Sequence, residues 1–232
     1  MATIAANLYQ LHHRIDAACT AASRPVQSVT LLVVSKTFSG DAVREAHAAG
    51  EHRFGENYVQ EGLDKIAELA DLRSSLEWHL IGPLQSNKSR GVAEAFDWVH
   101  SVDRLKLAQR LSEQRPASLP PLQVCLQVNI SGEASKSGVA PADLPELARA
   151  VASLPRLQLR GLMAIPAPAE GEQAQRLPHR ALAELMARTN RQLGLSMDTL
   201  SMGMSADMEA AILEGATMVR VGSAIFGSRP RP

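Results

Sequence analysis

Val29-Thr-Leu-Leu-Val-Val-Ser-Lys36 is the stretch from which the fold and the chemistry of this chain can be worked out. Seven residues that favour burial precede the lysine, and β-branched types recur among them, as in a strand that is covered on both faces. A lysine at the end of such a strand has its stem in the core and its amine at the rim. Desolvation lowers the pKa of an amine, and a neutral amine can attack an aldehyde to form a Schiff base. A lysine that simply extends into water is the alternative, which this position alone leaves open.

The composition favours a soluble protein of the cytoplasm. The chain has 232 residues with 24 Lys+Arg and 24 Asp+Glu, so its formal charge is zero and no basic excess indicates nucleic acid. Cys19 and Cys125 show no motif spacing, and Cys125 lies in an apolar run as a core residue would. The N-terminus has no signal-peptide pattern, and no apolar stretch has the length of a membrane span.

Strand-like and helix-like segments alternate along the chain. Strands are expected at 29–35, 52–54, 76–81, 96–101, 122–130, 157–165, 199–202 and 218–221. Helices are expected at 3–21, 41–49, 57–72, 84–95, 104–114, 142–153, 178–193 and 206–214, with Asp103 as the N-cap of the fifth and a loop at 166–177.

Eight alternations over this length predict an α/β fold, a single (β/α)₈ TIM-type barrel over residues 1–232 with an extra N-terminal helix. An open doubly wound sheet is the alternative, because alternation alone does not show closure. The turn after the first strand lacks the glycine fingerprint of a dinucleotide site, which argues against that alternative. The chain stops soon after the eighth strand, so we expect no second domain and a monomer.

Two loops suit a phosphate group. In such barrels the loops after the seventh and eighth strands commonly form a phosphate pocket. Met202-Gly-Met-Ser-Ala-Asp207 and Val221-Gly-Ser223 supply glycine, hydroxyl groups and backbone N–H groups at helix starts. Ser205 as a plain helix cap is the alternative. Together with a strand-end lysine, these loops favour a phosphate ester that carries an aldehyde.

The chain resembles the pyridoxal 5′-phosphate homeostasis proteins, whose fold is similar to the barrel domain of alanine racemase. The resemblance covers nearly the whole chain. It is carried by Val34-Ser-Lys36, Phe54-Gly-Glu-Asn57, Trp78-His-Leu-Ile-Gly-Pro-Leu-Gln-Ser-Asn-Lys88, Gly161-Leu-Met-Ala-Ile-Pro166, Ser201-Met-Gly-Met-Ser-Ala-Asp-Met208 and Arg220-Val-Gly-Ser-Ala-Ile-Phe-Gly227.

The resemblance implies a cofactor, pyridoxal 5′-phosphate, and a role for eight residues. Lys36 is implied to form the Schiff base with it. Ser205, Gly222 and Ser223 are implied to hold the phosphate, and Arg220 to lie by the pyridine nitrogen. Asn57, His79 and Met163 are implied to line the ring pocket. The resemblance also implies that the barrel lacks the C-terminal β-domain of alanine racemase.

Arg220 has a consequence that follows from its chemistry. An arginine cannot accept the proton of a ring nitrogen, and its positive charge disfavours a pyridinium beside it. Carbanion chemistry is therefore handicapped. An arginine that pairs with a nearby carboxylate at the barrel rim is the alternative. A metal site at His79, His100 and Glu56 has no typical ligand spacing, so no metal is expected. Lys136 is interpreted as a solvated loop lysine, with a second amine near the barrel mouth as the alternative.

We therefore expect a protein that buffers and carries pyridoxal phosphate and maintains vitamin B6 homeostasis, with no catalytic residue and no substantial turnover. Apo-enzymes that depend on pyridoxal phosphate are its possible recipients. The alternative is a pyridoxal-phosphate-dependent racemase or a related enzyme that acts on amino acids.

Overall fold

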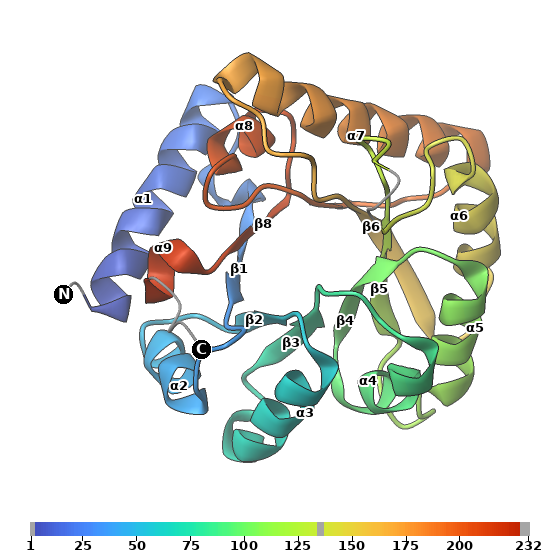
Figure 1. Ribbon diagram of the computed structural model, residues 1–232, viewed down its shortest axis with the longest axis horizontal. Coiled ribbons are helices and arrows are strands. Elements are labelled where there is room, and N and C mark those ends of the chain that lie inside the picture. The colour runs from blue at the N-terminus through green and yellow to red at the C-terminus, as the bar shows by residue number, and fades with distance from the viewer. Residues whose placement is uncertain (1–2, 134–136, 228–232) are drawn as a thin grey trace.

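The structure, a computed structural model, describes residues 3–133 and 137–227. Eight parallel strands form a closed barrel in which each strand pairs with the next and β8 pairs with β1 (Figure 1). The strands are β1 (Thr30–Val34), β2 (Arg53–Glu56), β3 (Glu77–Leu80), β4 (Trp98–Val102), β5 (Leu122–Gln127), β6 (Leu157–Met163), β7 (Thr199–Ser201) and β8 (Met218–Val221). The predicted barrel is confirmed, and the doubly wound sheet is excluded by the β1–β8 pairing.

Helices surround the barrel on the outside (Figure 1). They are α1 (Ile4–Ala21), α2 (Gly40–Ala48), α3 (Val59–Glu68), α4 (Ser89–Ala95), α5 (Leu105–Gln114), α6 (Leu144–Ala152), α7 (Glu172–Leu193), α8 (Met208–Leu213) and α9 (Ser223–Phe226). α1 precedes the first strand, as expected, and lies beside α8 and α9. Within the described part of the chain, no helix is long and apolar enough to cross a membrane.

The core has two parts because side chains alternate between the two faces of each strand. Outward-facing side chains such as Phe54, Trp78 and Leu80 pack with the helices in one large cluster. Two small apolar clusters fill part of the barrel interior. They contain Leu32, Val34, Ile81 and Met218, and Trp98, Cys125 and Met163.

Two local expectations are wrong. Asp103 is not the N-cap of α5: that position is Arg104, with which Asp103 forms an ion pair at 2.6 Å. The expected loop at 166–177 ends early, because α7 already begins at Glu172. Gly171 precedes it with φ +82°, a left-handed conformation that a glycine adopts without strain, and the chain turns there into the helix.

The register brings the ends of β1 and β8, which carry Lys36, Arg220 and Gly222, to the same end of the barrel. Leu32 of β1 is paired with Arg220 of β8, and Val33 with Val221, so both strands end at the same rim. Gly222 lies just beyond, where an added Cβ would stand 2.7 Å from the carbonyl oxygen of Val34. Glycine is required there because the two chain segments approach so closely.

Candidate functional site

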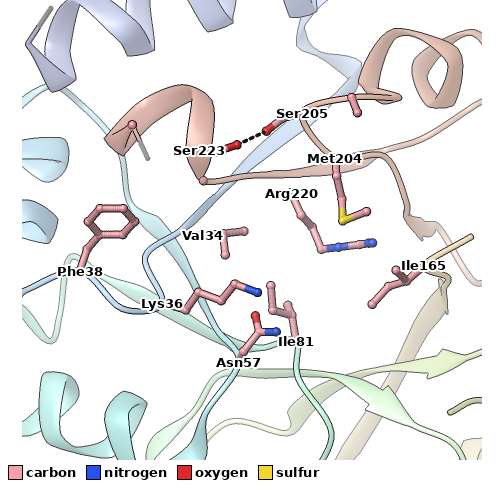
Figure 2. A pocket seen from close by; sticks show the side chains of 13 residues that line it. Val34, Lys36, Phe38, Asn57, Ile81, Ile165, Met204, Ser205, Arg220 and Ser223 are labelled. Carbon is pink, nitrogen blue, oxygen red and sulfur yellow. Dashed lines mark hydrogen bonds between the residues drawn. The ribbon is translucent and has the colours of Figure 1, made fainter. Parts of the chain in front are cut away.

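A cavity of about 370 Å³ opens at the C-terminal ends of the strands (Figure 2). Barrels of this kind carry their active sites at this face. Its lining combines one amine, one guanidinium, two hydroxyl groups, one amide and several apolar side chains. These residues are Val34, Lys36, Phe38, Asn57, Ile81, Ile165, Met204, Ser205, Ala206, Arg220, Gly222, Ser223 and Gly227.

Lys36 enters the cavity from the end of β1 (Figure 2). The strand continues its pairing one residue further, where the Ser35 N–H donates to the carbonyl oxygen of Gly55 at 3.0 Å. Thr37 then adopts φ +68°, which is unfavourable for a residue with a branched Cβ. The lysine thus lies between a paired strand residue and a strained turn.

A buried ionic network holds the backbone on both sides of Lys36. The Lys65 ammonium donates to the Ser35 carbonyl oxygen at 2.7 Å, to Glu56 Oε1 at 2.8 Å and to Glu61 Oε1 at 2.7 Å. Glu61 also accepts the Thr37 N–H at 2.5 Å, and the Ser35 hydroxyl donates to Glu56 at 2.6 Å. The residues on both sides of the site lysine are therefore fixed by the same three charged side chains.

Glu56 is fully buried, and this affects its ionisation. Burial raises the pKa of its carboxyl group, and the opposing effects of Lys65 and Ser35 do not cancel that rise. Its hydrogen-bond partners among the described residues are Ser35 and Lys65, and not His79 or His100, with which a metal site was considered. Among the described residues, no group of three or more His, Cys, Asp or Glu side chains is arranged to hold a metal ion.

Asn57 reaches the cavity from the end of β2, close to Lys36 (Figure 2). Its Oδ1 atom is buried and has no hydrogen-bond partner among the described residues. A buried amide oxygen without a donor is costly, so this atom is suited to a ligand that supplies one. Gly82 lets the two loops meet, because a Cβ there would lie 2.0 Å from the Asn57 carbonyl oxygen.

Two hydroxyl groups converge on the cavity from the loops after β7 and β8. Ser205 Oγ and Ser223 Oγ lie 3.2 Å apart (Figure 2). Ser205 is not the N-cap of α8, since that position is Asp207. The helix-cap alternative for Ser205 is therefore excluded. Asp207 accepts the Met204 N–H at 2.7 Å and contacts His179 at 2.9 Å, which fixes the loop that carries Ser205.

Arg220 extends into the cavity from β8 and is 4% exposed. Its Nη1 donates to Ser201 Oγ at 2.8 Å, and its Nη2 donates to the carbonyl oxygen of Ala164 at 2.9 Å. No carboxylate among the described residues forms an ion pair with it, so it is not the rim ion pair that the sequence left open. Burial lowers the pKa of this guanidinium to about 10, and it remains a cation at neutral pH.

His79 and Met163 do not line the cavity, which differs from what we expected of them. Both are completely buried. Met163 packs with Trp98 and Cys125 inside the barrel. His79 stacks on the Trp98 ring, with centroids 5.2 Å apart, and Nδ1 contacts His100. His79 is the last but one residue of β3 and Met163 is the last residue of β6, yet both side chains lie inside the barrel, one layer below its mouth.

Several apolar residues of the lining were not predicted. Ile81 and Ile165 follow β3 and β6, where a strand-end rule would have found them. Met204 lies on the loop after β7 that was expected to hold a phosphate, whereas Phe38 lies on a loop that had no comparable signal. Phe38 is held in place by stacking on Phe226, with ring centroids 4.7 Å apart. Lys136, considered above as a second amine, lies outside the described residues.

The chain is similar to known proteins along nearly its whole length. Residues 6–230 match the family model of the alanine racemase N-terminal domain. A pyridoxal phosphate homeostasis protein of Pseudomonas aeruginosa is 63% identical, over 99% of this chain and 97% of its own. That of Escherichia coli is 57% identical, over 99% and 98%. The solved structure of PipY from Synechococcus elongatus with pyridoxal phosphate bound has 39% identity and a TM-score of 0.84, and the match covers 97% of this chain and all of PipY.

Proposed function

The chain belongs to the pyridoxal phosphate homeostasis proteins, within the family of the alanine racemase N-terminal domain, and on that premise we propose that it binds pyridoxal 5′-phosphate and buffers its free level. One observation carries the proposal. The cavity brings together an amine, a hydroxyl pair and a buried cation, on Lys36, Ser205 with Ser223, and Arg220.

The residues present fit this cofactor. Pyridoxal phosphate combines an aldehyde, an aromatic ring with a nitrogen and a hydroxyl group, and a dianionic phosphate. The cavity offers a primary amine for the aldehyde, apolar side chains for the ring, and hydroxyl donors for the phosphate. The buried Asn57 Oδ1 is an acceptor that lacks a donor among the described residues. When bound, the cofactor supplies an aldehyde that condenses with an amine.

Each residue then has a proposed role. Lys36 holds the cofactor covalently as a Schiff base. Ser205 and Ser223 donate hydrogen bonds to the phosphate, and Gly222 leaves room for it beside the Val34 backbone. Asn57 binds a polar group at the ring edge.

Arg220 is proposed to pair with the ring nitrogen, and this favours a carrier over an enzyme. A guanidinium donates hydrogen bonds and cannot accept a proton, so the nitrogen beside it stays unprotonated. An unprotonated ring is a weak electron sink for reactions at the amino-acid α-carbon. No observation on the cavity favours the racemase alternative. We further propose that the protein is a cytoplasmic monomer that donates its cofactor to apo-enzymes.

Covalent trapping tests the proposal. Purified protein is incubated with pyridoxal phosphate, reduced with borohydride, digested and mapped by mass spectrometry. We expect the pyridoxyl adduct on the peptide that contains Lys36, and its loss in Lys36→Ala. The exposed Lys88 serves as a control, since Lys88→Ala keeps the adduct. An adduct mainly on other lysines, or an unchanged visible spectrum in Lys36→Ala, would contradict the assignment.

A further inference from the structure

A continuous series of hydrogen-bonded polar side chains crosses the interior of the barrel, which in such folds is usually filled by apolar layers. It begins at Glu77, at the start of β3, whose Oε1 lies 2.8 Å from His79 Nε2. His79 Nδ1 lies 2.9 Å from His100 Nε2, and His100 Nδ1 lies 2.8 Å from Ser201 Oγ. Ser201 accepts from Arg220 Nη1 at 2.8 Å. These five residues, here called the Arg220–Glu77 chain, join β3 and β4 to β7 and β8 on the opposite wall.

The two ends of the chain determine where its protons lie. Arg220 has only donors, and an ionised Glu77 has only acceptors. With Ser201 Oγ accepting from the arginine, its own hydrogen is directed to His100 Nδ1. His100 then donates from Nε2 to His79 Nδ1, and His79 donates from Nε2 to Glu77.

The opposite order leaves an unfavourable contact. If His100 Nδ1 donated to the serine, its Nε2 would have to accept from His79 Nδ1. A neutral His79 would then present a bare Nε2 to the Glu77 carboxylate, so two acceptors would face each other at 2.8 Å. With both histidines neutral and Glu77 ionised, every contact is satisfied only when each histidine carries its proton on Nε2.

Burial agrees with this order of protons. His79 and His100 are completely buried, and burial lowers the pKa of both imidazoles, that of His100 well below its ordinary value. Burial acts to raise the pKa of Glu77, but its contacts with His79 and Arg53 outweigh burial and leave the pKa lowered. Neutral histidines and an ionised glutamate are what the chain requires.

The chain is suited to orient a group and not to carry a proton. A route for protons needs an acceptor at its far end, and an arginine is none. The hydrogen bond to Ser201 restricts the orientation of the guanidinium. Among the described residues, the guanidinium has only one other acceptor, the Ala164 carbonyl oxygen. The three links from His79 to Arg220 are buried, so water does not replace one of them that is lost, whereas the contact of His79 with Glu77 is only partly buried.

We infer that the Arg220–Glu77 chain fixes the guanidinium of Arg220 in the cavity and makes its position depend on Glu77, at the opposite end of the barrel. The inference rests on the proposed function, in which this guanidinium pairs with the ring nitrogen of pyridoxal phosphate. Ser201, His100, His79 and Glu77 are accordingly positioning residues: none of the four lines the cavity.

The proton order is tested first, on the full chain without cofactor. Nitrogen NMR of the ¹⁵N-histidine-labelled protein reports the tautomer of each ring, and His79→Gln and His100→Gln assign the signals. We expect both residues neutral with the proton on Nε2 at neutral pH. Ser201→Ala removes the donor to His100 Nδ1 and should change the His100 signals. Thr199 lies on β7 with Ser201 but does not belong to the Arg220–Glu77 chain. Thr199→Val removes its buried hydroxyl group and should leave the His100 signals unchanged. A cationic imidazole, or a proton on Nδ1 of His79 or His100, would contradict the proton order proposed for the Arg220–Glu77 chain.

The positioning role is tested by cofactor affinity and by the absorption spectrum of the bound cofactor. Ser201→Ala should weaken pyridoxal phosphate binding by about tenfold, as expected when one buried hydrogen bond to a charged group is lost, and should shift the spectrum. Glu77→Gln, remote from the cavity, should shift the spectrum in the same direction by less, and Thr199→Val should not shift it. Unchanged affinity and spectrum in Ser201→Ala would overturn the role. If the wild-type protein itself bound no pyridoxal phosphate, the proposed function would fail. The histidine spectra would still show whether the hydrogen bonds of the Arg220–Glu77 chain have the proposed order.

Discussion

The hydroxyl oxygens of Ser205 and Ser223 lie 3.2 Å apart, although the residues come from the loops after different strands. Two hydroxyl groups at this distance can bind each other in the free protein and turn together toward an anion. Their proximity depends on the pairing of β7 with β8 and on the Met204–Asp207 turn. The pair therefore provides a phosphate site that requires little rearrangement on binding.

Ser205→Ala should lower the affinity for pyridoxal phosphate by about ten- to a hundredfold, because a hydrogen bond to a charged group contributes about 1.5–3 kcal/mol. Affinity for unphosphorylated pyridoxal should barely change. Fluorescence titration with both ligands measures the difference. Equal losses for the two ligands would show that Ser205 supports the loop and not the phosphate.

Lys65→Met should reduce the free energy of unfolding by about 3 kcal/mol, since it leaves the buried Glu56 without its cation. The double variant Glu56→Gln/Lys65→Met should recover part of the loss because no uncompensated charge remains. Urea unfolding of the three proteins gives the values, with Lys106→Met as an exposed-lysine control. The same single variant should slow Schiff-base formation, as the turn around Lys36 loses its support. A single variant as stable as the wild type would contradict the role of Lys65.

Glu214 should make stability depend on pH. Hydrogen bonds from Arg180 and Arg176 hold the pKa of its carboxyl group at about 2, below the usual 4.5. A carboxyl group with a lowered folded-state pKa stabilises the fold fully above its unfolded pKa. This contribution is lost as the pH falls from about 4.5 to about 2.

Glu214→Gln should therefore lower the melting temperature at neutral pH, and the difference from wild type should shrink as the pH falls through that window. Differential scanning calorimetry across pH measures it. Glu209→Gln, which breaks an exposed pair between Glu209 of α8 and Arg14 of α1, is the matched control and should have a small effect. A deficit in Glu214→Gln that stayed constant down to pH 2 would count against the lowered pKa.

Racemisation of amino acids should occur at most at a trace level. It needs an acid–base group on each face of the cofactor, and Lys36 can serve one face. The two tyrosines of the chain, Tyr9 and Tyr58, are 63% and 59% exposed, and neither lines the cavity. Loss of a positioned acid or base typically costs about 10²–10⁴-fold in rate. A chiral assay with a panel of amino acids tests this, and turnover at an ordinary enzymatic rate, about 1–10³ per second, would restore the enzyme alternative.

The barrel could be predicted because eight apolar runs are separated by amphipathic segments, and that pattern reflects burial on both faces of parallel strands. The rule that strand ends carry the chemistry leads to Lys36, Asn57 and Arg220, which all line the cavity, while their roles toward a cofactor stay predictions. It does not tell which residue of a strand end is the last one to face the mouth. His79 and Met163 were therefore expected one layer too high.

Long-range partners were beyond prediction from the sequence. Nothing in the sequence distinguishes Lys65 within the helix expected at 57–72, although its ammonium supports the turn around Lys36. His100 and Ser201 lie 101 positions apart, and only closure of the barrel brings them together. Such contacts depend on the stagger of strands, which a hydrophobic pattern does not encode.

The close approach of Gly222 to the Val34 carbonyl oxygen has a consequence for the order of events during protein synthesis. The proposed covalent anchor is synthesised early, at the end of the first strand, whereas the proposed phosphate-binding hydroxyl groups and the guanidinium belong to the seventh and eighth strands and the loops after them. A nascent chain can thus expose its lysine but cannot retain the vitamin until the last strand has docked against the first. Retention of the cofactor therefore indicates that the barrel has closed.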